Sequence, residues 1–398
     1  MGRGDGAPLT TTSRPARAGR RRAVRFAPEH TPAVQAFNQR LARAGAPWRF
    51  PETAIPDWLP QVAGVPVWQE YFLLLEDDTV RGAFVLKRQE AALGGGYRRV
   101  GSFYWPLSEG AVDSTYAAVA PRLLQAALEQ EPLLFGIVAR DKAIAKLDQA
   151  LGWRLVTLPF YFKALRPTRF LRELQVLRRR PGIALLLDVA ALTGAGWLGL
   201  KLAGSARGGR PRSDRTVRVE LVERFGDWAD AIWAANLPHY SFAGGRDAGA
   251  LNATYPPGGA TFLRLRVSRG DSAIGWAVVQ DSLPASNDHF GAMRVGTIVD
   301  GFAAPEHAGA VIRAGADVLA QRGMDLIISN QSHHAWRRGL VEAGFLPGPS
   351  SCLFAAAPAL ASLIANADPA GRAVHVNRGD GDWPWGAGLE APADPAAS

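Results

Sequence analysis

Apolar and polar positions follow two different periods along the stretch from Met293 to Phe345. The period changes from two to about 3.6 and back, which is typical of strands separated by helices. Pro at a helix entrance and Gly near a helix end agree with this order. The pattern predicts a strand over Arg294 to Val299, a turn at Asp300–Gly301, a helix from Pro305, a strand over Asp325 to Ser329 and a helix ending at Ala343.

The same pattern occurs twice in the chain. Four landmark pairs in matching local sequences repeat at nearly one offset: Arg25 and Arg218 are 193 residues apart, Gly82 and Gly275 also 193, Gly101 and Gly296 195, and Gly152 and Gly344 192. Repetition at one offset indicates a duplicated structural unit. We therefore predict an α/β fold of two tandem mixed-sheet domains, related by a pseudo-twofold axis and joined by a helical connector.

The order strand, helix, strand, short helix and Gly-Phe resembles the cofactor half of the GNAT N-acetyltransferase superfamily, and both copies resemble its domain. In that family the loop after the fourth strand holds the pyrophosphate of acetyl-CoA on backbone N–H groups, which suits a helix N-terminus. The family's loop reads Gln/Arg-x-x-Gly-x-Gly/Ala; here it keeps Gly309 but begins with Glu306, which repels a polyphosphate. The resemblance implies acetyl-CoA or another acyl-CoA as substrate, with cofactor contacts at Val299, Gly309, Ala310 and His334.

Two further positions of the family pattern differ between the copies. The family has an Asn eleven residues before the Phe of its Gly-Phe and a Tyr general acid six residues after that Asn. His334 and Leu340 hold these places in the second copy, and Lys142 and Asp148 hold them in the first. Because the first copy departs further from the pattern, we expect it to shape the substrate cleft and the second copy to hold the cofactor.

These patterns divide the chain into five parts. We expect a disordered basic arm over 1–22, a degenerate GNAT-like domain over 23–165, a basic and apolar connector over 166–215, a GNAT-like domain with the cofactor site over 216–358, and a C-terminal helix and tail over 359–398.

The composition excludes several other classes of protein. The formal charge of +9 gathers in segments that flank the two copies, without a nucleic-acid-binding motif, so we expect no nucleic-acid partner. The single cysteine, Cys352, suits a reducing compartment, and the N-terminus lacks the apolar run of a secretory signal, so we expect a cytoplasmic protein. His333 and His334 are adjacent rather than spaced as ligands, so we expect no metal.

The connector contains a nearly continuous apolar segment, Ile183 to Gly204, after a basic amphipathic stretch that begins at Phe170. Its length would span a bilayer, but Asp188 is costly there and spanning would separate the copies. Two other interpretations remain: residues 170–204 lie on an anionic membrane surface, which would make the protein peripheral at the inner membrane, or they pack against the domains.

Candidate catalytic and substrate-binding residues lie in three places. His239 and Tyr240 follow the first helix of the second copy, and a loop His is a candidate base near neutral pH. Asp300 closes the strand on the cofactor side. The tail concentrates polar and aromatic side chains within a few positions; we interpret His375 and Asp380 as catalytic and Asn377 and Arg378 as substrate-binding, and expect them to converge between the two copies.

The resemblance extends to GNAT-like proteins of bacterial polysaccharide and cell-envelope pathways and to the architecture of FemAB-type transferases. It implies an acyl-CoA-dependent N-acyltransferase acting on an amino sugar or related small-molecule amine. Two alternatives stay open: a FemAB-type aminoacyltransferase that uses aminoacyl-tRNA, and a non-catalytic scaffold associated with the membrane.

Overall fold

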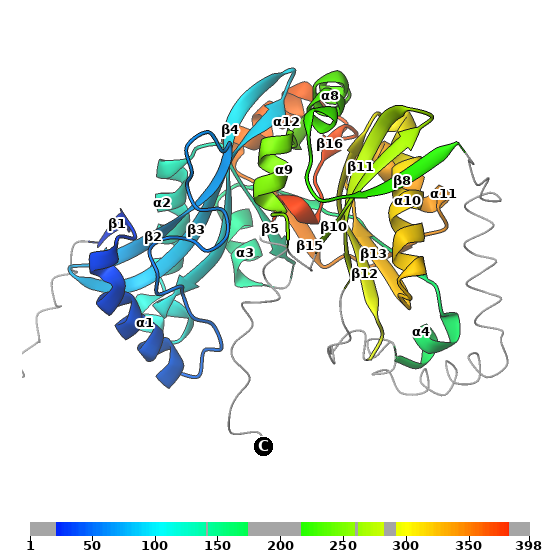
Figure 1. Cartoon of the computed structure of the whole chain (residues 1–398). Helices are drawn as coiled ribbons and strands as arrows, with labels where there is room; N and C mark the ends of the chain where they lie inside the picture. The colour runs from blue at the N-terminus through cyan, green and yellow to red at the C-terminus, as the bar shows by residue number, and fades with distance from the viewer. Residues whose placement is uncertain (1–20, 141, 174–215, 259–261, 282–291, 382–398) are drawn as a thin grey trace, which may run out of the picture.

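The computed structural model describes residues 21–140, 142–173, 216–258, 262–281 and 292–381. Within these ranges the chain forms two mixed sheets side by side, with helices on their faces (Figure 1). The predicted arm up to residue 20 and most of the connector, including 183–204, lie outside the described residues. Among the helices of the described ranges, none has the length and apolar character needed to cross a membrane.

Sheet A belongs mainly to the first copy. Seven of its strands follow one path, β1 (Arg21–Arg25), β2 (Val67–Glu76), β3 (Thr79–Leu93), β4 (Gly96–Ser108), β5 (Leu134–Ala139), β15 (Cys352–Ala356) and β6 (Arg154–Thr157). Two short strands branch from this path: β9 (Phe242–Gly244) pairs with β3, and β16 (Val374–His375) pairs with β9. Both short strands come from the second half of the chain, so this branch ties the halves together.

Sheet B belongs mainly to the second copy. Its path is β14 (Leu346–Gly348), β7 (Phe160–Ala164), β13 (Leu326–Asn330), β12 (Val295–Ala303), β11 (Ser272–Asp281), β10 (Phe262–Arg269) and β8 (Val217–Val222). Read from its other end, this order matches sheet A strand for strand. The prediction of two copies of one mixed-sheet α/β domain is confirmed.

One exchange joins the copies. β7 pairs with β13 and β14 in sheet B, and β15 pairs with β5 and β6 in sheet A. The predicted domains 23–165 and 216–358 therefore each contribute a strand to the other's sheet. Since each sheet needs a strand from the other copy, neither sheet is complete by itself.

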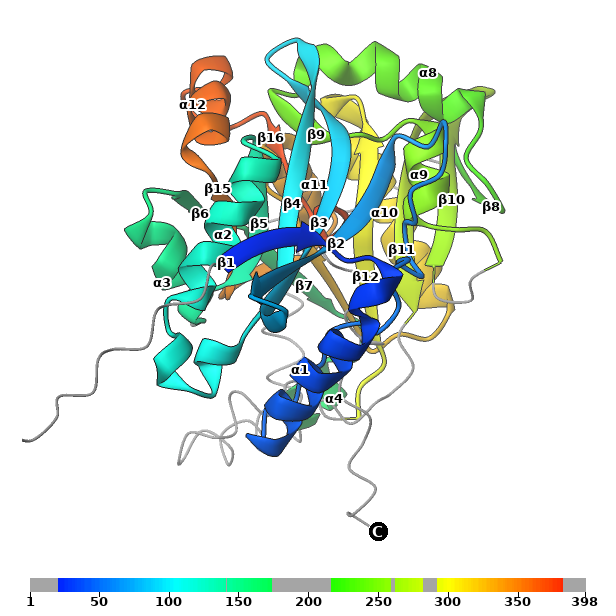
Figure 2. The same ribbon diagram turned by 90° about the vertical axis from the view of Figure 1, so that its left-hand side faces the viewer.

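Helices cover the sheet faces and bury apolar stripes at helical spacing. In α1, the buried residues Val34, Phe37 and Leu41 pack on sheet A, and Figure 2 looks onto this half with α1 and β1 towards the viewer. The helices are α1 (Thr31–Arg43), α2 (Val119–Gln130), α3 (Ala143–Ala150), α4 (Pro167–Glu173), α8 (Asp227–Asn236), α9 (Ala248–Thr254), α10 (Ala308–Gln321), α11 (His334–Glu342) and α12 (Pro358–Ala367). Short 3₁₀ turns include η4 (Leu237–His239) and η6 (Arg378–Asp380).

The strand β12 is longer than the sequence pattern predicts. The turn expected at Asp300–Gly301 is wrong, because β12 continues through both residues to Ala303 and pairs them with β11. A bulge at Val299, rather than a turn, interrupts the regular register with β11. Asp300 stays in a buried strand because partners distant in sequence satisfy its carboxylate, as described next.

Candidate functional site

The parallel strands β12 and β13 part towards their carboxyl ends. They pair only over Val295–Ile298 and Leu326–Ser329, while β12 runs on to Ala303. We call the space beyond this pairing the second gap. The carboxyl ends of neighbouring parallel strands are where open α/β sheets bind ligands, so the occupant of this gap bears on function.

The C-terminal segment occupies the second gap. Residues 331 and 377 form an isolated antiparallel bridge, and the N–H of Ser332 donates to the carbonyl of Val376 at 3.1 Å. On the other side, Nε2 of His375 donates to the carbonyl of Gly301 at 2.9 Å. The segment 374–381 thus contacts both parted strands and fills the space between them.

A buried ionic triad fastens this segment. Nε of Arg246 donates to Oδ1 of Asp300 at 3.1 Å, and Nη2 donates to Oδ2 of Asp380 at 2.8 Å. Arg246 is only 2% exposed, and Asp300 and Asp380 are also buried. Burial alone lowers the pKa of an arginine, but the two carboxylates raise the pKa of Arg246 above its ordinary value. The guanidinium therefore stays charged and holds the tail to β12.

The remaining lone pairs of Asp300 are also used. Oδ1 accepts from Nδ2 of Asn377 at 2.7 Å and from the N–H of Gly301 at 2.7 Å, and Oδ2 accepts from the hydroxyl of Tyr255 at 3.0 Å. Burial, then the charge of Asp300, raises the pKa of Tyr255, so its hydroxyl keeps its proton. Because its carboxylate accepts from four donors and is buried, Asp300 is placed to hold the tail rather than to take a proton from a substrate.

The first copy contacts the same tail through Lys87 of β3. Its buried Nζ donates to the carbonyls of Asp380 at 3.0 Å and Gly381 at 3.2 Å. A Cβ on Gly379 would overlap the hydroxyl of Tyr255 and lie 2.8 Å from Oδ2 of Asp300, so only glycine fits there. The tail is therefore enclosed by side chains from both copies.

Aromatic rings surround His375. Its ring centroid lies 5.2 Å from that of Tyr240 and 5.3 Å from that of Trp336. Burial, then the charge of Arg246, lowers the pKa of His375 well below its ordinary value, so the imidazole is neutral. Tyr240 donates to the carbonyl of Ala303 at 2.6 Å and accepts from Nε1 of Trp336 at 3.0 Å. His375 and Tyr240, both predicted to be catalytic, are therefore buried in this cluster.

The other predicted residues lie apart from this cluster or at its rim. His239 is exposed at the end of η4, although the adjacent Tyr240 is buried. Arg378 reaches out of the tail, and its Nε donates to Oδ1 of Asn330 on β13 at 2.9 Å. His334 is exposed and bonds to the carbonyl of Arg372 at 2.9 Å. The predicted convergence of the tail between the copies is observed, whereas His239 does not join it.

The predicted cofactor loop is covered by α11. A Cβ on Gly339 would lie 2.9 Å from Cα of Gly309, so the two glycines allow α10 and α11 to meet closely. Val299, Gly309 and Ala310 are all buried in this packing. Helix α11 therefore packs against Gly309, the glycine that the sequence pattern associates with pyrophosphate binding.

The corresponding gap in the first copy is different. β4 and β5 pair only at Gly101–Leu134 and Ser102–Phe135 and then part, and we call the space beyond them the first gap. The residues along it are half-buried rather than buried: Tyr104, Trp105 and Pro106 on β4, and Ile137, Val138 and Ala139 on β5. The last described residue of the tail is Gly381, where an added Cβ would lie 3.2 Å from Ile137 of β5. Among the described residues, the first gap is therefore less filled than the second.

Two features single out the β4 side of the first gap. Trp105 has φ of +51°, in the left-handed region that non-glycine residues rarely adopt, and strain of this kind gathers at functional sites. The register with β3 shifts here, so that β4 has a bulge over Trp105 and Pro106. A hollow of about 330 Å³ lies beside it, between Trp48 after the end of α1 and the Pro106–Ser108 end of β4. Sequence reasoning missed this feature because its residues form no recognisable catalytic or binding motif.

Comparisons with known proteins concern the fold. No protein-family model matches the sequence, and no curated protein is similar to it in sequence. Among solved structures, N-myristoyltransferase of Saccharomyces cerevisiae with bound myristoyl-CoA is similar with a TM-score of 0.49 and 9% identity, over 87% of this chain and 80% of that one. A protein of Enterococcus faecalis described as a probable N-acyltransferase gives 0.47 and 10%, over 86% and 74%.

A tandem GNAT protein from the clavulanic acid biosynthesis pathway is similar over 85% of this chain and 99% of its own length, with a TM-score of 0.41 and 12% identity. In the present chain the strand order repeats within itself, sheet A against sheet B. The chain is a tandem repeat of one mixed-sheet α/β domain whose two copies exchange their final strands.

Proposed function

We propose that the protein is an acyl-CoA-dependent N-acyltransferase whose acyl-CoA binds in the first gap rather than in the second copy. The observation that carries this proposal is the contrast between the gaps: the tail and α11 fill the second, whereas β4 and β5 line the first with half-buried residues. A ligand needs an accessible site, and both gaps lie at equivalent positions of one repeated fold.

The surroundings of the first gap suit an anionic thioester. Helix α2 follows β4 and begins at Val119 without a side-chain cap, so the N–H groups of Val119 and Ala120 and the positive end of the helix dipole are candidate partners for phosphate, whereas Pro121 has no N–H. The bulge leaves Trp105 outside the β3 ladder, and its N–H is a candidate donor to the oxyanion that forms when an amine attacks the thioester carbonyl. The adjacent hollow would accept part of the acyl chain or the acceptor.

The acceptor class is the one expected from the sequence, an amino sugar or related amine, and we propose envelope polysaccharide synthesis as its setting. The amine nitrogen attacks the carbonyl and forms the amide carbon–nitrogen bond, and the carbon–sulfur bond breaks. The proton that the nitrogen gives up is balanced by the proton that the CoA thiolate takes up as it leaves as the thiol. Because Asp300 and His375 are enclosed, their role here is to hold the tail and the two copies together.

Calorimetric titration with acetyl-CoA and longer acyl-CoA esters tests where the ligand binds. Val138→Asp places a carboxylate on β5 beside the first gap, where one unfavourable charge costs about 1 kcal/mol or more and should weaken binding about tenfold. Because Val138 also packs against the core of the first copy, the melting temperature of the variant is measured alongside to show that it is folded. The matched control Val138→Thr keeps the shape without the charge and should bind as the wild type does.

A variant of the second copy tests which of the two copies binds the ligand. Gly309→Ala changes the covered loop of the second copy and should leave acyl-CoA affinity unchanged if the ligand lies in the first gap. Affinity that falls with Gly309→Ala and not with Val138→Asp would return the cofactor to the second copy. If wild type and all variants give no saturable heat, the acyl-CoA proposal fails, and the aminoacyl-tRNA and scaffold alternatives take its place.

A further inference from the structure

Among the described residues, no strand pairs with the outer edge of β8, and apolar side chains lie along this strand. It pairs with β10 on one side and ends the path of sheet B, and Figures 1 and 2 both place it at the margin of the molecule. Val219 is 40% exposed and Leu221 is 58% exposed. A long apolar edge strand is a template for pairing with another chain, which most proteins avoid.

The other margins of the two sheet paths carry protection that β8 lacks. β1, the equivalent strand of the first copy, has three arginines and no acid, so pairing it with itself gathers positive charge without a compensating carboxylate. β14 contains Pro347, which has no N–H to donate. β6 has four residues. Among the described strands that end these paths, β8 is the unprotected one.

We propose that β8 pairs with β8 of a second copy of this chain in an antiparallel, twofold-symmetric dimer. In the register centred on Val219, Arg218 lies opposite Glu220 of the other copy, and the reverse pair forms by symmetry. The same register places Val217 opposite Leu221. The sequence of this one strand is therefore complementary to itself in both charge and apolar side chains.

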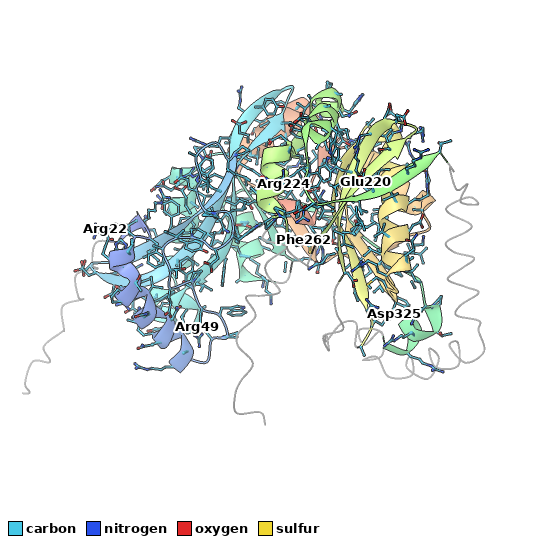
Figure 3. All side chains as sticks on the ribbon, in the orientation of Figure 1. Arg22, Arg49, Glu220, Arg224, Phe262 and Asp325 are labelled. Atoms are coloured by element: carbon cyan, nitrogen blue, oxygen red, sulfur yellow. The ribbon has the colours of Figure 1, made fainter. Side chains whose placement is uncertain are left out.

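The proposed pairing joins two seven-stranded sheets into one continuous sheet and removes both exposed edges. The ion pair found for Glu220 among the described residues is a long contact to Arg266 at 3.9 Å, and the side chain of Glu220 is 67% exposed, so little is lost when Glu220 turns to a partner. Figure 3 shows Glu220 on the sheet B side and Arg22 of β1 on the far side of the molecule. This association is independent of the proposed acyl-CoA site in sheet A.

Sedimentation of the full chain over a concentration series tests the dimer. The wild type should show a reversible monomer–dimer equilibrium. Arg218→Glu opposes like charges twice across the interface and should raise the dimer dissociation constant about tenfold. Glu220→Arg should do the same, and the double variant Arg218→Glu/Glu220→Arg should restore the wild-type constant. Arg22→Glu on β1 is the matched control and should change nothing.

Hydrogen exchange locates the contact. The amide protons of 217–222 that face away from β10 should be protected at high protein concentration and exchange freely on dilution. A wild type that sediments as a monomer at every concentration overturns the proposal. So does a dimer that both single charge reversals leave intact, because its interface then lies elsewhere.

Discussion

Arg246→Met is expected to lower the free energy of unfolding by about 3–5 kcal/mol, because it leaves the carboxylates of Asp300 and Asp380 buried without their cation. Both carboxylates lie within 3.1 Å of the guanidinium and are nearly inaccessible to water. For a chain of this size a loss of that magnitude lowers the melting temperature by about 4–6 °C. Calorimetry or thermal circular dichroism at neutral pH measures it.

Two further variants separate the buried charge from loss of side-chain volume. Arg224→Met removes an exposed arginine from the same half of the chain and should change stability by no more than about 0.5 kcal/mol. Adding Asp380→Asn to Arg246→Met removes one uncompensated charge and should recover part of the loss, so the two substitutions are not additive. If Arg246→Met melts at the same temperature as the wild type, the triad does not hold the tail.

The repeat and the element types could be predicted from the sequence because they depend on local periodicity. The helix from Pro305 and the strand ending at Ser329 follow directly from apolar spacing. The exchange of β7 and β15 could not be predicted, since both strands have the same kind of sequence and neither states which sheet it joins. Strand partnership is a property of the assembled sheets.

The same distinction applies to the candidate site. The density of polar residues after Ala373 pointed to an ordered tail, and His375, Asn377 and Asp380 are indeed buried between the copies. Their main partner, Arg246, lies 134 residues before Asp380 and stands in no recognisable motif. When that partner is not known, an Asp followed by Gly indicates a turn. This is why the turn predicted at Asp300–Gly301 was wrong.

The buried tail also changes which copy is expected to act on a ligand. The family pattern favoured the second copy because Gly309 is retained there, but a glycine permits close approach of any group, and here the group is Gly339. The first copy lacks the glycine spacing yet keeps its strand ends half-exposed. The proposal of the first gap therefore gives accessibility, which only the assembled fold determines, more weight than the motif.

Asp148 of α3 carries the second large expected effect. Its carboxyl is 2% exposed, and Oδ1 has no hydrogen-bond partner among the described residues. Burial raises the pKa of Asp148 from 3.8 to about 7. The folded state therefore holds this proton more tightly than the unfolded chain does, and ionising the group works against the fold.

Asp148→Asn is expected to stabilise the protein at high pH and to have only a small effect near pH 4. Well below the ordinary pKa of 3.8 the carboxyl is protonated in both the folded and the unfolded state, so the amide replaces a neutral group by a neutral group. Between pH 4 and 7 the unfolded chain loses the proton first, so the stability of the wild type falls as the pH rises, and above pH 7 the full cost of the buried charge is present. The gain of the variant should therefore grow through this window to a plateau of roughly 2–4 kcal/mol. Urea unfolding of the wild type, Asp148→Asn and the exposed control Asp78→Asn at pH 4, 6 and 8 measures it. A gain of the same size at all three pH values would show that packing, rather than the proton, is responsible.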